Sequence, residues 1–283
     1  MKKFIVMFIA FIFVLAFIIG HCNDDTPDIL CKTDNAVELP IEPKREGLSN
    51  KMANEPIINS IESPVILLDI SEKILVRKTY TLSYNKETKL PNWVAWHLTS
   101  EHVNGNLPRD NNYYEDENVP SPRATNDDYR GSGWSRGHMC PAGDNKWDSE
   151  AMRESNLLTN ICPQHASLNS GLWNVIERDC REWAKKYGEI YIVCGPVFLN
   201  KEHETIGKNK VVVPEAFFKV ILRLNPQPAA IGFVVRNNEG KKKRDQYINT
   251  VDDVERITGI DFFPALPDSI ENVVETYANL KDW

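Results

Sequence analysis

A short window between Ser135 and Glu177 holds the pattern that most restricts what this chain can form. It contains, in order, Ser135-Arg136-Gly137-His138, the segment NICPQ at 160–164, Asn169 and Glu177. Histidine accepts a proton near neutral pH, an amide oxygen suits a hard cation such as Mg²⁺, and arginine pairs with phosphate through two N–H groups. Together these side chains predict metal-assisted hydrolysis of a phosphodiester bond, which no single one of them would indicate.

Hydrophobic patterning begins near Pro64 and predicts an α+β fold, with a mainly antiparallel β-sheet and helices packed against it. We expect strands at 65–69, 75–84, 93–98, 157–161, 189–194, 211–213, 217–224 and 229–235. Asp148 is suited to cap a short helix, and a last helix is expected near 268–279. Segment 104–134 is rich in Gly, Asn, Asp and Pro, which predicts a long loop of the kind that often serves function.

The longest predicted helix runs from Asn169 to Tyr187. Its apolar residues recur at steps of three and four, as expected for a stripe that faces the core. Asn169 at its start can offer an amide oxygen to a cation, although an N-cap is the common use of asparagine there. Glu177 lies about two turns further, so without a bend in the helix it reaches the same ion only through water.

The N-terminal residues indicate export. Lys2-Lys3 precedes an apolar run from Phe4 to Ile19, which predicts a signal peptide over residues 1–22. Cys22 lies where a bacterial lipoprotein is lipidated, so we expect either a lipoprotein anchored in the cell envelope or outer membrane, or a secreted protein. Residues 23–62 are polar and lack periodicity, which predicts a flexible linker before a single domain at 63–283.

Bulk composition narrows the function classes. The net charge of −7 argues against a protein that coats nucleic acid through its overall charge, but it allows an enzyme that grips a few phosphates locally. Six cysteines occur without a CxxC pair, which argues against a structural zinc site or a thioredoxin-type redox motif.

The quoted motifs resemble the DNA/RNA non-specific endonucleases, whose active site is a ββα-metal (His-Me finger) unit. The resemblance rests on SRGHMCPAGD from residue 135, TNICPQ from residue 159 and LNSGLW from residue 168, and it extends from about residue 64 to the end. It implies hydrolysis of DNA and RNA with little sequence specificity, one Mg²⁺ ion (with Mn²⁺ as the alternative) and products with 5′-phosphate ends.

The resemblance also implies roles for single residues. His138 becomes the general base, Asn169 the direct metal ligand, and Asn160 and Glu177 the residues that hold the metal's waters. Arg136 is expected to contact phosphate or to brace the site. A further upstream arginine would stabilise the transition state and bind substrate, with Arg109 as the first placement and Arg123 or Arg130 as rivals.

The sequence departs from the family pattern at Ser135, where an aspartate is usual. This leaves open a weakened enzyme that acts as a surface lipoprotein and binds nucleic acid without turnover. A third hypothesis is a thiol hydrolase that pairs Cys140 or Cys162 with His165.

Overall fold

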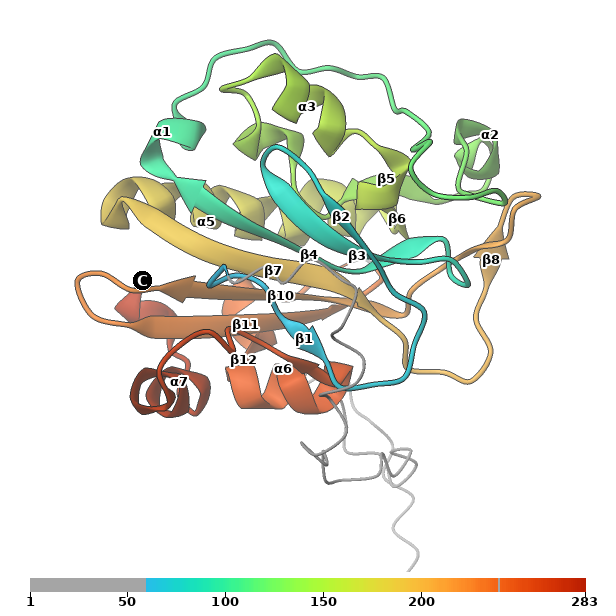
Figure 1. Ribbon diagram of the computed structural model, residues 1–283. Coiled ribbons are helices and arrows are strands. Elements are labelled where there is room, and N and C mark those ends of the chain that lie inside the picture. Colours follow the sequence, from blue (N-terminus) through green and yellow to red (C-terminus); the bar gives the residue numbers. More distant parts are fainter. Residues whose placement is uncertain (1–59, 239) are drawn as a thin grey trace, which may run out of the picture.

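The computed structural model describes residues 60–238 and 240–283 (Figure 1). The predicted signal peptide, the predicted lipidation site Cys22 and nearly all of the predicted linker at 23–62 lie outside these residues. Among the helices described, none is both long and apolar enough to cross a membrane.

The centre of the molecule is a seven-stranded sheet in which every neighbouring pair of strands is antiparallel. In spatial order its strands are β12 (Ile248–Asn249), β11 (Ala229–Arg236), β10 (Ala216–Arg223), β7 (Glu189–Val197), β4 (Leu90–Thr99), β3 (Tyr80–Asn85) and β2 (Lys73–Val76). This confirms the predicted α+β fold with a mainly antiparallel sheet. In the described residues, three short pairs lie outside it: β1 (Val65–Ile66) with β13 (Ile260–Asp261), β5 (Ser135–His138) with β6 (Ile161–Gln164), and β8 (Thr205–Ile206) with β9 (Val211–Val212).

Helices cover both faces of the sheet. Figure 1 shows α5 (Asn174–Tyr187) and α3 (Ser149–Ser155) on one side, and α6 (Val251–Thr258) and α7 (Asp268–Glu275) on the other. Alternate residues of β10 therefore enter different cores: Phe217 and Ile221 face α5, and Phe218 packs on the side of α6 and α7. Because both faces are covered, the central strands read as nearly continuous apolar runs.

Two predicted strands were wrong. Segment 75–84 is a hairpin, because the chain turns after β2 and the Arg77 N–H donates to the Tyr80 carbonyl oxygen at 2.8 Å. Segment 157–161 is mostly the 3₁₀ turn η3 (Leu158–Asn160), and the strand begins only at Ile161. In segment 75–84 the alternation of side chains continues on both sides of the tight turn, so the sequence pattern alone did not show that the strand is interrupted there.

The predicted helix at 169–187 is also not continuous. It consists of the π-helical turn η4 (Asn169–Trp173) and α5, with non-helical backbone angles at Gly171 (φ −99°, ψ −109°), and the short helix α4 (Ala166–Leu168) comes directly before it. The apolar stripe of α5 is buried as predicted, and Gly188 ends the helix with φ +89°. The π-helical turn thus interrupts the regular helix between Asn169 and Glu177.

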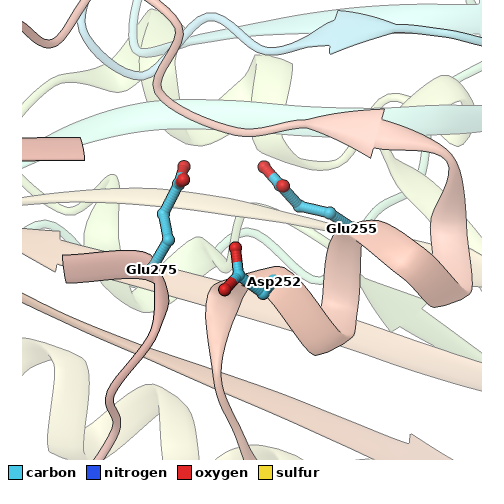
Figure 2. A group of neighbouring side chains, drawn as sticks. All are labelled: Asp252, Glu255 and Glu275. Carbon is cyan, nitrogen blue, oxygen red and sulfur yellow. The ribbon is translucent and has the colours of Figure 1, made fainter. Parts of the chain in front are cut away.

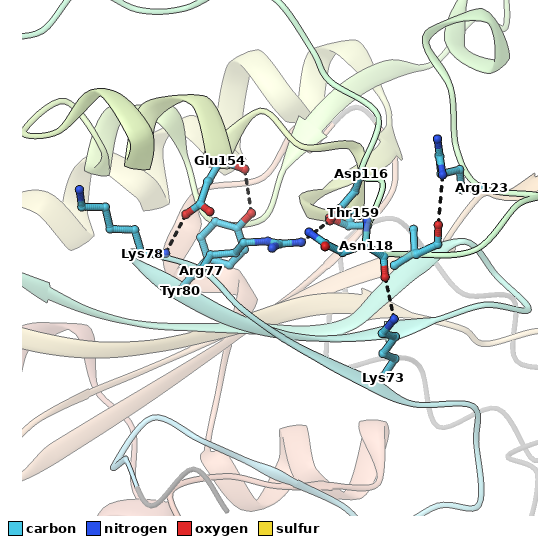
Figure 3. A network of polar contacts seen from close by, with 10 residues as sticks. Lys73, Arg77, Lys78, Tyr80, Asp116, Asn118, Arg123, Glu154 and Thr159 are labelled. Atoms are coloured by element: carbon cyan, nitrogen blue, oxygen red, sulfur yellow. Dashed lines mark hydrogen bonds and ion pairs between the residues drawn. The ribbon is translucent and has the colours of Figure 1, made fainter. Parts of the chain in front are cut away.

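The long segment 104–134 follows the short helix α1 (Ser100–Val103) and is irregular except for α2 (Asn126–Tyr129). The hairpin β2–β3 fixes it to the domain (Figure 3). Arg77 and the hydroxyl of Thr159 both bond to Oδ2 of the buried Asp116, at 2.5 and 2.7 Å, and Lys73 Nζ donates to the Asn118 carbonyl at 2.6 Å. The loop is thus held at its middle by buried polar contacts rather than left free.

On the opposite side of the sheet, three carboxylates converge between α6 and α7 (Figure 2). The oxygen atoms of Asp252, Glu255 and Glu275 lie within 4.8 Å of one another. Burial, followed by the neighbouring negative charges, raises the pKa of Glu275 to about 8, and burial raises that of Glu255 to about 7. This acidic cluster is separated by the sheet from the residues discussed next.

Candidate active site

Two short antiparallel strands present the SRGH sequence. β5 (Ser135–His138) pairs with β6 (Ile161–Gln164), so that Gly137 lies opposite Cys162 and His138 opposite Ile161. A Cβ atom on Gly137 would lie 2.3 Å from the side-chain oxygen of Gln164 and 2.7 Å from its Cβ. The glycine is therefore needed for close approach of Gln164. Together with the helix that follows, the strands form the ββα unit predicted from the motifs.

The imidazole of His138 is held by Asn156, the residue that ends α3. Nε2 of His138 lies 2.8 Å from the Asn156 amide oxygen, and the Asn156 nitrogen donates to the Asp110 carbonyl at 3.0 Å. The second bond fixes which end of the amide faces the ring, so Nε2 carries the proton. Nδ1 bonds to no described residue and keeps its lone pair, as a base requires.

Burial sets the proton affinity of His138. The side chain is only 6% exposed, and burial lowers its pKa to about 4, while the Asn156 bond opposes this and the positive charge of Arg109 adds to it. The imidazole is therefore neutral at every pH near 7. A neutral ring can accept a proton, so its charge state agrees with the predicted general base.

Arg136 projects from the same strand, two residues before His138. Its guanidinium lies over the rings of Tyr113 and Tyr129 at 5.2 and 5.3 Å and donates to the Asn126 carbonyl at 3.0 Å. The Nε atom is buried without a hydrogen bond to any described residue. Arg136 is thus fixed by stacking and by its bond to the Asn126 carbonyl. Its contact with phosphate stays a prediction.

Asn169 opens the π-helical turn beside β5. Its side-chain nitrogen points to the Arg136 carbonyl at 3.5 Å, and its oxygen bonds to no residue in the described part of the chain. Glu177, in the first turn of α5, likewise makes no hydrogen bond there. Glu177 is partly exposed, yet burial raises its pKa to about 7, against the opposing charge of Lys219. Both residues offer oxygen acceptors without a protein donor, and that donor set suits a hard divalent cation.

Arg109 reaches this site and its two rivals do not. The exposed Arg109 side chain interacts with Tyr113, and its charge acts on both His138 and Glu177. Arg123 is engaged elsewhere, with Glu115 and the Val119 carbonyl, and Arg130 forms a surface pair with Asp127. The geometry therefore favours Arg109 among the three candidates.

Asn160 was expected to hold waters of the metal ion, but it lies inside the protein, where its side chain bonds to the backbone. It is fully buried, its oxygen accepts from the Cys140 N–H at 2.9 Å, and its nitrogen donates to the Cys140 and Ser155 carbonyls at 2.8 and 2.7 Å. These bonds fix the backbone just after His138 relative to the end of α3. Contact of Asn160 with metal-held water stays a prediction.

The thiol hypothesis finds no support in the geometry. Cys140 and Cys162 are completely buried, and burial raises the pKa of each thiol well above its ordinary range. Neither thiolate would form at neutral pH. His165 caps α4 with its own ring nitrogen and lies against Trp134.

Sequence reasoning missed Asn156 and Tyr113, which contact His138 from α3 and from the long loop. Tyr113 lies 5.5 Å from the His138 ring between centroids and also stacks on Arg136. No local pattern marks either residue, since an asparagine after a short helix reads as an ordinary end of that helix.

Comparison with known proteins agrees with this arrangement. The family described as DNA/RNA non-specific endonuclease matches residues 59–269. The mitochondrial nuclease EXOG of Mus musculus is 38% identical over 205 residues, which are 66% of this chain and 56% of that protein. A nuclease of Nostoc sp. is 32% identical over 219 residues, 72% of this chain and 77% of the relative.

Among solved structures, the crystal structure of an EndoG/EndoGI complex superimposes with a TM-score of 0.66 at 30% identity, and the match covers 70% of this chain and 89% of that one. The chain spans little more than half the length of the EXOG relatives it matches. With the match to residues 59–269, the seven-stranded sheet and the ββα unit around His138, the chain belongs to the DNA/RNA non-specific endonuclease family.

Proposed function

We propose that the protein is an endonuclease that hydrolyses phosphodiester bonds of DNA and RNA with little sequence preference. The observation that carries the proposal is the pairing of a neutral His138, with its Nδ1 lone pair available, with the unbonded amide oxygen of Asn169 on the same ββα unit. Contacts through arginines and a cation act on the phosphate backbone, which is the same for every sequence.

In the proposed mechanism, His138 Nδ1 removes a proton from the attacking water, and Asn156 keeps the ring oriented through Nε2–H. Arg136 and Arg109 bind the phosphate and offset the negative charge that grows in the transition state. Asn169 would hold one divalent cation, with Glu177 reaching it through water. When bound, that ion supplies Lewis-acid stabilisation of the phosphate charge.

Mg²⁺ is the proposed ion, with Mn²⁺ as the alternative, and the proposed products carry 5′-phosphate ends. Export through residues 1–22, with lipidation at Cys22 or release as a secreted protein, is proposed from the sequence alone. In that setting the substrate would be nucleic acid outside the cytoplasm.

The test is degradation of plasmid DNA and of RNA by the protein with Mg²⁺, with Mn²⁺, with EDTA, and by the variant His138→Ala. We expect cleavage with the cation and loss of it with EDTA or in the variant. His97→Gln is the matched control, because His97 bonds Glu189 and stacks on Tyr191, away from β5. Full activity of His138→Ala would remove the mechanism. Binding of DNA in a shift assay with no cleavage under any of these conditions would instead support a binder without turnover.

A further inference from the structure

Strand β10 contains a lysine in the middle of an apolar run. Lys219 has no exposure to solvent, and its neighbours on the same face, Phe217 and Ile221, belong to the core beneath α5. Lysine is almost never fully buried unless its charge is compensated, because the ammonium loses its hydration. An apolar side chain would pack better at this position of β10. The presence of a lysine there therefore requires a functional explanation.

Two indole rings enclose the Lys219 ammonium. Its Nζ lies 4.5 Å from the ring centroid of Trp173 and 5.0 Å from that of Trp96. Nζ makes no hydrogen bond to a nitrogen or oxygen of the described residues, and the facing Cys194 thiol on β7 is only a weak acceptor. Attraction to the two ring faces is therefore its main short-range polar contact, and burial strengthens such contacts.

The two tryptophans connect this ammonium to the active site. Trp173 Nε1–H donates to the His138 carbonyl oxygen at 3.2 Å, and Trp96 Nε1–H donates to the Asp144 carboxylate at 3.2 Å. Trp173 is also the last residue of the π-helical turn that begins with Asn169. A movement of the Trp173 ring would therefore change the position of His138 relative to Asn169.

We propose that Lys219 is a positioning residue: its ammonium clamps the Trp173 ring against Trp96 and thereby fixes the spacing between His138 and Asn169. The proposal rests on the proposed function, in which those two residues are the base and the metal ligand. The charge needed for the clamp is maintained inside the protein. Burial lowers the pKa of Lys219, but neighbouring groups, among them the carboxyl groups of Glu177 and Asp144, oppose this, and the net pKa is raised.

The test is Lys219→Met, which keeps much of the side-chain length and removes the charge. We expect kcat to fall by roughly tenfold to a hundredfold, since small misplacements of reacting groups cost that much. KM for DNA should change little because the buried Lys219 does not reach substrate. The thermal midpoint should stay the same or rise, since an apolar side chain replaces a buried charge without a strong partner.

Arg223 provides the matched control, because it is a second buried cation on β10. It lies four residues from Lys219, about 13 Å along the strand, over the rings of Tyr187 and Trp283. It also donates to the Gln227 and Asp282 carbonyls, so Arg223→Met should lower the thermal midpoint and leave kcat unchanged. Loss of the structural cation Arg223 is thus expected to lower the thermal midpoint but not kcat. Loss of the positioning cation Lys219 is expected to lower kcat but not the thermal midpoint.

Two further variants test the route through Trp173. Lys219→Arg keeps a cation and should retain most of the wild-type kcat. Trp173→Phe keeps a ring but loses the bond to His138, so it should lower kcat, and the double variant with Lys219→Met should lose less than the two separate losses combined. Wild-type kcat in Lys219→Met, or a fall of kcat and thermal midpoint together, would overturn the proposal. Inactive His138→Ala beside fully active Lys219→Met would refute only the role of Lys219, whereas active His138→Ala would refute the proposed function itself.

Discussion

The amide oxygen of Asn156 lies 2.8 Å from Nε2 of His138, and this contact decides which nitrogen of the ring is basic. Because the other end of the Asn156 amide donates to the Asp110 carbonyl, the oxygen cannot exchange places with the nitrogen without losing that bond. The tautomer with hydrogen on Nε2 is therefore favoured, and Nδ1 is left for proton transfer.

Substitution of Asn156 should affect the chemical step more than substrate binding. In Asn156→Ala the ring loses its orienting acceptor, so we expect kcat to fall by roughly a hundredfold, within the range general-base catalysis contributes, with KM nearly unchanged. Asn156→Asp retains an acceptor for Nε2–H and should keep more activity than the alanine variant. Steady-state kinetics on a defined duplex measures both effects.

The control for this pair is Asn145→Ala, because Asn145 is another buried amide close by. It bonds the Pro141 carbonyl and the Cys140 sulfur but not His138. It should lower stability while kcat is maintained. If Asn145→Ala and Asn156→Ala reduced kcat equally, the orienting role of Asn156 would be untenable.

His138 should titrate near pH 4 in the folded protein, below its ordinary value of 6.5. The unfolded chain therefore binds more protons between these values. The contribution of the neutral, buried ring to the free energy of unfolding is therefore complete above about pH 6.5 and is lost as the pH falls toward 4. An NMR titration of the imidazole measures the shift directly, and Arg109→Ala should move the midpoint upward because it removes a nearby positive charge. Arg123→Ala should not move it, and a midpoint near 6.5 in the wild type would contradict the burial argument.

Some of this site could be predicted from the sequence, and the missing parts have physical causes. The motifs predicted the sequence of β5, β6 and the following helix correctly. They could do so because short-range constraints select these residues, such as the close approach of Gln164 that requires glycine at 137. Asn156 and Lys219 carry no such local signal. Their importance comes from tertiary contacts, with Asn156 reaching His138 from the end of α3 and Lys219 reaching Trp173 from the sheet.

Secondary structure shows the same limit. Amphipathic periodicity predicted α5 well, but it continued through Gly171, where the backbone leaves the helix. π-helical turns inside helices often occur at functional sites, where they change the direction of side chains. Here the turn lies between Asn169 and Glu177, and periodicity alone cannot reveal it.

The three candidate arginines should separate in kinetics. Arg109 is exposed beside Tyr113, and its charge reaches His138 and Glu177, so Arg109→Ala should lower kcat/KM by roughly a hundredfold to a thousandfold, as loss of one transition-state donor does. Arg109→Lys should recover part of the loss, since lysine keeps the charge without the bidentate geometry.

The rivals serve as controls for that series. Arg123→Ala removes contacts with Glu115 and the Val119 carbonyl and should lower the thermal midpoint without a comparable loss of kcat/KM. Arg130→Ala removes only an exposed pair with Asp127, so neither quantity should change measurably. A larger kinetic loss in Arg123→Ala than in Arg109→Ala would assign the upstream role to Arg123 instead.

Glu275 should make the protein less stable in alkali. Its pKa is about 8 in the fold, against an ordinary 4.5, because it is half-buried beside the acids Glu255, Glu271, Asp252 and Asp261. The folded state therefore holds the extra proton, and the stabilisation is complete below about pH 4.5 and is lost as the pH rises through 8. Glu275→Gln removes the negative charge, so its denaturation midpoint should exceed that of the wild type near pH 9 and match it near pH 5. The control is Glu117→Gln, which removes an exposed charge and should leave the denaturation midpoint equal to that of the wild type at both pH values. If both variants changed the midpoint equally, the carboxylates between α6 and α7 would not interact as their spacing requires.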